Sequence, residues 1–164
     1  MYTKKQKIEV HIIFILITFA LEIFSFFLIR KGVITIYQHH ALPAWTFPAH
    51  WALPIWTILY GLIALSGARI WIKRKSLVRR FALTAWMIQI CLNTVWPITF
   101  LYLDLRIITP ILVTLLFLTI CILMFYTFLL DRLAGFFLIP YSLVIIYKLL
   151  SQWIFYILDI NVLA

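Results

Sequence analysis

The chain contains 164 residues, of which 66% are hydrophobic and 12% are charged, and its formal net charge is +9. Soluble globular domains are about half apolar and about one quarter charged. This composition therefore excludes a soluble domain, a disordered chain and a nucleic-acid-binding protein, and it predicts an all-α membrane protein.

Five apolar stretches of the sequence are long enough to cross a bilayer. A spanning helix needs about 20 mostly apolar residues, and charged residues separate these stretches from one another. The predicted helices are, in chain order, residues 10–29, 51–72, 81–103, 107–130 and 133–158. We therefore expect residues 1–164 to form a single domain, a five-transmembrane-helix bundle with a long aromatic first loop.

The distribution of Lys and Arg predicts how the bundle is oriented. Most of these residues lie before the first predicted helix and in the segment 73–80, and with five spans both regions share one side of the membrane. The positive-inside rule places that side and the N-terminus in the cytoplasm, and the C-terminus outside. For a bacterial chain we expect the inner (plasma) membrane. The segment 73–80 is interpreted as a topology signal and as a contact for anionic membrane lipid.

The predicted first loop, residues 30–50, is long without being polar. Pro43 and Pro48 prevent a continuous helix across it. Its large apolar side chains are Tyr37, Trp45, Phe47 and Trp51. We interpret this segment as a cover over the mouth of the bundle. The alternative is a belt of aromatic residues at the membrane surface.

Polar residues inside the predicted spans are a second functional signal. A charge at the bilayer centre costs about 2.5–3.5 kcal/mol on insertion scales, so a charged residue there faces a cavity or a partner. Lys148 is interpreted as the counter-charge of an acidic ligand or of Glu22. Asn93 is interpreted either as part of a ligand site or as a hydrogen-bonding contact between helices.

Motifs typical of enzymes are absent from the sequence. It contains no HExxH, CxxC, Ser-His-Asp or phosphate-cradling glycine pattern. His39, His40 and His50 lack a Cys or acidic companion, which makes them a poor metal site. We therefore predict no catalytic residue, no metal ligand and no required cofactor.

Ala64 and Ala68 have the small-xxx-small spacing with which membrane helices approach one another closely. Such pairs also occur by chance. A further alternative function is a non-binding scaffold that acts through helix contacts, and this pair is then a candidate face for a homodimer.

Three stretches together resemble the TspO/MBR family of tryptophan-rich sensory proteins and translocator proteins. The first, residues 43–60, contains PAWTFP and then WTILY, similar to the family pattern PxWxPP followed by WxxL[YF]. The second, residues 92–100, reads LNTVWPITF and is similar to LNxxW[SP]xxF. The third, residues 140–153, begins with PY and ends with QW, and it matches its family motif in part.

The resemblance implies a compact five-helix bundle, commonly dimeric, that binds porphyrins, haem and related hydrophobic ligands under the first loop. Aromatic walls suit a flat tetrapyrrole, and an ammonium group can pair with its propionates. Porphyrin or haem is then the ligand of the protein and not a cofactor. Carried over by position, the ligand-binding residues are Tyr37, Trp45, Phe47, Trp56, Tyr60, Asn93, Trp96, Phe100, Val144 and Lys148.

Three of these positions depart from the family pattern. Phe47 stands where the first proline of a pair is usual, and Val144 replaces a Trp. Lys148 stands where the family has a small residue, usually Ala, that faces the ligand. A lysine there either fills part of the inherited pocket or pairs with an acidic ligand.

The function predicted from these residues is that of a membrane receptor or sensor for a porphyrin-like or other flat hydrophobic ligand. One alternative is a transporter of tetrapyrroles or of small hydrophobic acids. Another is a light-dependent porphyrin-degrading enzyme, for which Trp56 and Trp96 are retained while one Trp of the family pocket is not. We favour binding over catalysis.

Overall fold

The computed structural model describes residues 2–39, 49–101, 103, 105 and 107–163, with the backbone alone for residues 28–39, 49, 52 and 159–163. Its helices are α1 (Lys4–His39), α2 (Ala49–Ile72), α3 (Leu77–Leu101), α4 (Ile108–Leu130) and α5 (Arg132–Leu163). All regular secondary structure in the described ranges is helical, which confirms the predicted all-α fold class.

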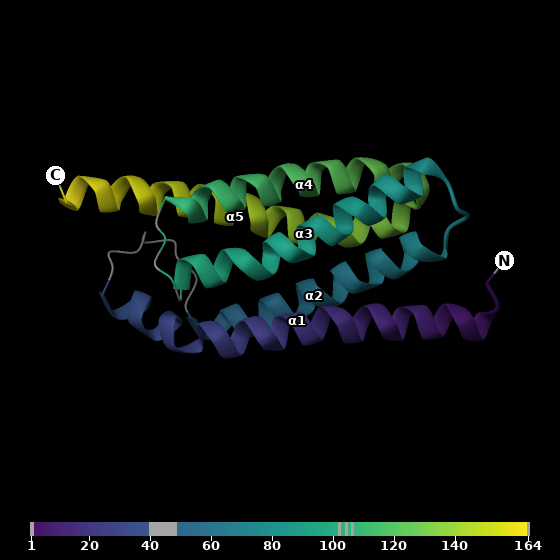
Figure 1. The fold of residues 1–164 in the computed structure, drawn as a ribbon, viewed down its shortest axis with the longest axis horizontal. Coiled ribbons are helices and arrows are strands. Elements are labelled where there is room, and N and C mark those ends of the chain that lie inside the picture. The colour runs from purple at the N-terminus through teal and green to yellow at the C-terminus, as the bar shows by residue number, and fades with distance from the viewer. Residues whose placement is uncertain (1, 40–48, 102, 104, 106, 164) are drawn as a thin grey trace.

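The five helices form a closed ring around the interior of the molecule. α1 packs against α2 and α3, α2 packs against α5, α5 packs against α4, and α4 packs against α3. Figure 1 shows the helices aligned with the long axis, and the N-terminus and C-terminus lie at opposite ends. The α2–α3 and α4–α5 connections lie with the N-terminus. We call this end the N-terminal end and the opposite one the C-terminal end.

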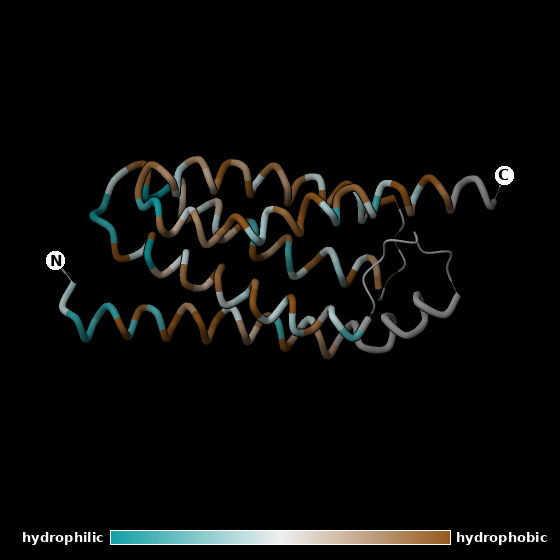
Figure 2. Tube along the Cα trace, turned by 180° about the vertical axis from the view of Figure 1, so that it is seen from behind, coloured by the Kyte–Doolittle hydropathy of each residue, from teal (hydrophilic) through white to brown (hydrophobic). Residues whose placement is uncertain are grey.

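The outer surface of the ring is suited to lipid. Each helix contains a stretch that is long and apolar enough to cross a membrane. Figure 2 shows hydrophobic residues along the middle of the bundle and hydrophilic residues gathered at the N-terminal end. Large apolar side chains also point outward, with 64% of Leu16 and 65% of Ile58 exposed. Hydrocarbon solvates such side chains, and helices satisfy their own backbone hydrogen bonds, so the chain is an integral membrane protein.

Helix α1 is longer than the sequence predicted. It does not end near residue 29 but continues to His39, so the first loop cannot begin at Arg30 as expected. The charges of Arg30 and Lys31 limit the membrane span, because charge is costly in hydrocarbon, but they do not break a helix. Helix α5 likewise continues past the predicted end at residue 158 and reaches Leu163.

Ala64 and Ala68 lie inside the ring and not on its outer face. Both residues are 0% exposed, because the other helices of the same chain cover them. The predicted dimer face at these two positions is therefore wrong. Their small side chains serve contacts within the chain, where they let α2 approach its neighbours closely.

Gly67 is a point of close contact among three helices. A Cβ atom at this position would lie 2.6 Å from the Trp86 ring of α3 and 2.8 Å from the Phe14 ring of α1. The indole nitrogen of Trp86 also donates a hydrogen bond to the carbonyl oxygen of Ile63, over 3.0 Å. The indole thus lies directly against the backbone of α2, and glycine leaves the room that it needs.

Asp131 ties the α4–α5 connection to α2. Its carboxylate accepts hydrogen bonds of 2.9 and 3.1 Å from the Arg69 guanidinium and lies 2.9 Å from the Lys73 ammonium. It also accepts hydrogen bonds from the amides of Leu133 and Ala134, which open α5. Burial alone would raise the pKa of Asp131. Lys73, the Ala134 amide and Arg69 outweigh burial and hold this pKa below its ordinary 3.8.

Candidate functional site

Helices α2, α3 and α5 bring together most of the residues predicted to bind a ligand. On each helix these residues are spaced by three or four positions, so they share one face. Because α2 packs against both α3 and α5, the three faces meet in the half of the bundle toward the C-terminal end. The residues are Trp56 and Tyr60 on α2, Asn93, Trp96 and Phe100 on α3, and Val144 and Lys148 on α5.

Trp96 is the centre of the aromatic part of the site. It is buried, and its ring centroid lies 6.0 Å from that of Trp56, with 44° between the ring planes. Trp56 in turn meets Tyr60 edge to face at 6.3 Å. Both distances fall within the range in which aromatic rings attract one another. The two helices therefore supply a connected aromatic surface, as the sequence predicted for these three residues.

Asn93 forms its hydrogen bond within α3 and not between helices. The indole nitrogen of Trp96 donates to its side-chain oxygen over 3.2 Å. Because an indole nitrogen can only donate, the amide oxygen of Asn93 must face it. The amide nitrogen is buried and has no hydrogen-bond acceptor in the described part of the chain. Asn93 therefore offers a donor to the interior of the site.

Lys148 lies over the same aromatic surface. Its ammonium is 5.5 Å from the ring centroid of Trp96 and 5.9 Å from that of Tyr147, which are distances of a cation–π contact. Both salt bridges among the described residues end on Asp131, so Lys148 has no carboxylate partner among them. The site thus holds a cation that lies over aromatic rings and has no carboxylate partner among the described residues.

Glu22 is not paired with Lys148, the partner that the sequence analysis considered for it. Its carboxylate accepts a hydrogen bond from the Thr57 hydroxyl over 3.0 Å, and no salt bridge joins it to Lys148. Glu22 is also buried, at 8% exposure. Of the two readings of Lys148, the pair with Glu22 is therefore wrong.

Phe155 belongs to the site although sequence reasoning missed it. Its ring meets that of Phe100 edge to face, with centroids 5.3 Å apart, and so joins α5 to α3. Phe155 follows Lys148 by seven positions, which is two helical turns along the same face of α5. This spacing is the signal that could have identified it.

A packed layer separates the site from the N-terminal end. The Tyr141 hydroxyl of α5 donates to the side-chain oxygen of Gln89 on α3 over 2.9 Å, and both side chains are 0% exposed. Trp86, 2% exposed, lies one turn before Gln89 on α3. These three buried side chains lie inside the ring on the side of the site toward the N-terminal end.

The side chains that the first loop was predicted to contribute to the site are not among those that the structure describes. The backbone of Tyr37 belongs to α1, but its side chain is not described, and Trp45 and Phe47 fall within residues 40–48. Their contact with a ligand stays a prediction. Val144 is described, and it is partly buried against the hydrophobic core.

The described side chains can bind a ligand more readily than they can transform one. They supply aromatic surface for stacking, an amide donor and an ammonium group. No group of three His, Cys, Asp or Glu residues in the described part of the chain could hold a metal ion. The arrangement is that of a mostly apolar binding site with a few polar groups that orient its occupant.

The sequence of the chain matches the model of a known protein family. The sequence model of the TspO/MBR family matches residues 14–157, which is nearly the whole chain. No curated protein matched the chain.

Proposed function

The chain belongs to the TspO/MBR family, and from this premise we propose that it is a membrane receptor for a flat, hydrophobic, anionic ligand of the porphyrin type. Family membership supports a role as a membrane sensor or transporter in the broader sense. The observation that carries the finer proposal is the Lys148 ammonium, which lies over Trp96 without a carboxylate partner among the described residues.

The chemistry of such a ligand complements the site. A porphyrin offers a flat apolar face to Trp56 and Trp96, and stacked rings contribute about 0.5–1.5 kcal/mol beyond their buried area. Its propionates are anions, and a hydrogen bond to a charged group contributes about 1.5–3 kcal/mol. Lys148 supplies that charge, and the free amide nitrogen of Asn93 supplies a second donor.

The packed layer favours a receptor over a transporter. A transported ligand must pass from the site to the N-terminal end, and Trp86, Gln89 and Tyr141 fill that path. We therefore expect saturable binding without uptake when the protein is reconstituted into liposomes and supplied with protoporphyrin IX. Uptake above that of empty liposomes would favour the transporter.

The binding proposal is tested by titrating the purified protein in detergent with protoporphyrin IX and measuring the quenching of tryptophan fluorescence. We expect one saturable site, and Lys148→Ala should weaken binding about tenfold, because it removes a charge-assisted hydrogen bond. Octaethylporphyrin, which carries no carboxylate, serves as the second probe. Its affinity should change little in Lys148→Ala.

Lys5→Ala is the matched control, since it removes the same charge from an exposed position at the N-terminal end. It should leave both affinities unchanged. Tighter binding of protoporphyrin IX by Lys148→Ala would mean that Lys148 blocks the site instead of pairing with the ligand. Absence of saturation in both proteins would refute the porphyrin proposal.

A further inference from the structure

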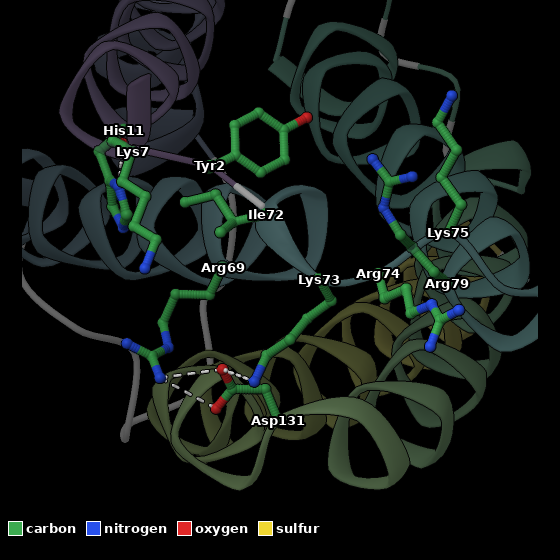
Figure 3. A pocket seen from close by; sticks show the side chains of 10 residues that line it. All are labelled: Tyr2, Lys7, His11, Arg69, Ile72, Lys73, Arg74, Lys75, Arg79 and Asp131. Atoms are coloured by element: carbon green, nitrogen blue, oxygen red, sulfur yellow. Dashed lines mark hydrogen bonds and ion pairs between the residues drawn. The ribbon is translucent and has the colours of Figure 1, made fainter. Parts of the chain in front are cut away.

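A pocket lies at the N-terminal end of the bundle, apart from the candidate ligand site. Its volume is about 740 Å³, and α1, α2, the α2–α3 connection, α3 and the residue between α4 and α5 contribute its walls. Figure 3 shows it from close by, with Asp131 at one edge and the Arg69 and Lys73 side chains pointing toward it. The cations that line it are Lys7, Arg69, Lys73, Arg74, Lys75 and Arg79.

The positive charge of this pocket is only partly neutralised within the chain. Asp131 is its single carboxylate, and it pairs with Arg69 and Lys73 at 2.9 Å each. The other four cations form no salt bridge with a described residue, because both salt bridges there end on Asp131. The pocket therefore has a strong excess of unpaired positive charge.

Arg79 is the cation whose setting most requires an anion. The residue is 8% exposed, and its Nε atom is buried without an acceptor in the part of the chain that the structure describes. Its guanidinium lies 5.1 Å from the ring centroid of Trp71. A buried guanidinium nitrogen without an acceptor is costly, and the planar fork of an arginine matches the oxygens of a phosphate group.

The position of the pocket relative to the membrane indicates the source of that phosphate. Its lining includes Ile72, the last residue of the α2 span, and Arg79, close to the start of the α3 span at Leu77. This is the level of lipid headgroups. Trp71 beside Arg79 is 42% exposed and presents an apolar wall to an acyl chain.

We propose that this pocket binds the phosphate group of an anionic phospholipid, held chiefly by Arg79. The site is independent of the porphyrin site, from which the layer of Trp86, Gln89 and Tyr141 separates it. Either proposal can fail while the other stands.

The test is a calorimetric titration of the purified protein in detergent with dihexanoyl phosphatidic acid, with dihexanoyl phosphatidylcholine as the neutral comparison. Arg79→Gln should weaken binding of phosphatidic acid about tenfold. Arg80→Gln is the matched control, because Arg80 is the adjacent residue, is exposed and does not line the pocket. It should change the affinity less than about twofold.

A second variant guards against misfolding of Arg79→Gln. Arg74 and Lys75 are exposed pocket residues, and replacing both with Gln should weaken binding about fivefold without lowering the Tm. Equal losses in Arg79→Gln and Arg80→Gln would overturn the proposal, because surface charge alone would then explain binding. Pyrophosphate is the soluble probe. If it bound as tightly as phosphatidic acid, with the same dependence on Arg79, the assignment to lipid would be overturned in favour of a soluble phosphate.

Discussion

The bundle holds the Arg69 and Lys73 pair and the single Lys148 in opposite ways. At the N-terminal end, Arg69 and Lys73 share the carboxylate of Asp131. Toward the C-terminal end, the Lys148 ammonium lies over the rings of Trp96 and Tyr147 without a carboxylate partner among the described residues, and the carboxylate of Glu22 accepts its hydrogen bond from Thr57.

The difference follows from access to water. The side chains of Arg69 and Lys73 are 33% and 40% exposed, so they keep part of their hydration while they neutralise Asp131. Lys148 lies within the α5 span, where hydration is lost and every unpaired charge is costly. Arg69 and Lys73 therefore stabilise the fold, whereas Lys148 indicates a place for a ligand.

The largest effect should come from Asp131→Ala. It removes two ion pairs and the hydrogen bonds that begin α5, and we expect a loss of about 3 kcal/mol after allowing for the exposure of Arg69 and Lys73. The measurement is thermal unfolding in detergent. Glu9→Ala, at an exposed position without a salt bridge, is the control and should unfold like the wild type. Equal Tm values for both variants would show that the N-terminal end does not depend on this ion pair.

Gly67→Ala should destabilise the contact of α2 with α1 and α3 near the N-terminal end. The new Cβ would meet the Trp86 and Phe14 rings, and overpacking of this kind costs about 1–3 kcal/mol. Gly61→Ala is the matched control, since nothing lies within 4 Å of a Cβ there, and it should be neutral or slightly stabilising. Thermal unfolding of the two variants decides the matter. A Gly67→Ala protein as stable as Gly61→Ala would mean that the rings can move aside.

Lys148→Met should raise the stability of the protein, whereas changes at the N-terminal end should lower it. Replacing a partly buried charge that has no carboxylate partner among the described residues with an apolar side chain of similar length should stabilise the protein by about 1 kcal/mol. Lys73→Met should instead destabilise it by less than about 1 kcal/mol, because Lys73 is partly exposed and paired. Thermal unfolding of both variants without ligand tests the contrast. A loss of stability in Lys148→Met would contradict it.

Lowering the pH should destabilise the N-terminal end through protonation of Asp131. This effect on stability should be smaller than those of the three substitutions above. The folded-state pKa of Asp131 lies below 3.8, so its stabilisation is fully present above that pH and is lost as the pH falls through the folded value. The Tm should therefore drop more steeply in the wild type than in Asp131→Asn as the pH falls below about 4. If both proteins lost stability in parallel, other carboxyl groups would be responsible.

The fold was predictable from the sequence because each membrane span needs about 20 mostly apolar residues in a helix. The five predicted apolar stretches form five helices, and the aromatic residues of α2 and α3, which were carried over from the family resemblance, lie together. The helix ends were harder to predict. Arg30 and Lys31 end a span without ending α1, since hydropathy reports the depth of the membrane and not the length of a helix.

The contacts inside the ring were less predictable, because they depend on which helices are neighbours. The spacing of Ala64 and Ala68 indicates close approach but not whether the partner helix belongs to the same chain. The choice of Thr57 over Lys148 as the partner of Glu22 likewise requires the ring order of α1, α2 and α5. Phe155 was missed because its one signal, the seven-residue spacing from Lys148, identifies a site residue only once the face of α5 that Lys148 occupies is known to line the site.

The lysine of α5 also affects how the chain is assembled during synthesis. A lysine near the centre of a membrane helix disfavours its release from the translocon into lipid by about 2.5–3.5 kcal/mol. The aromatic face that receives Lys148 belongs largely to α3, which precedes α5 in the chain and is therefore made first. Helix α5 thus enters a membrane in which α3, whose Trp96 contacts Lys148, is already present. Integration of α5 should be more efficient in the presence of α3 than alone, and the order of the helices along the chain contributes to that efficiency.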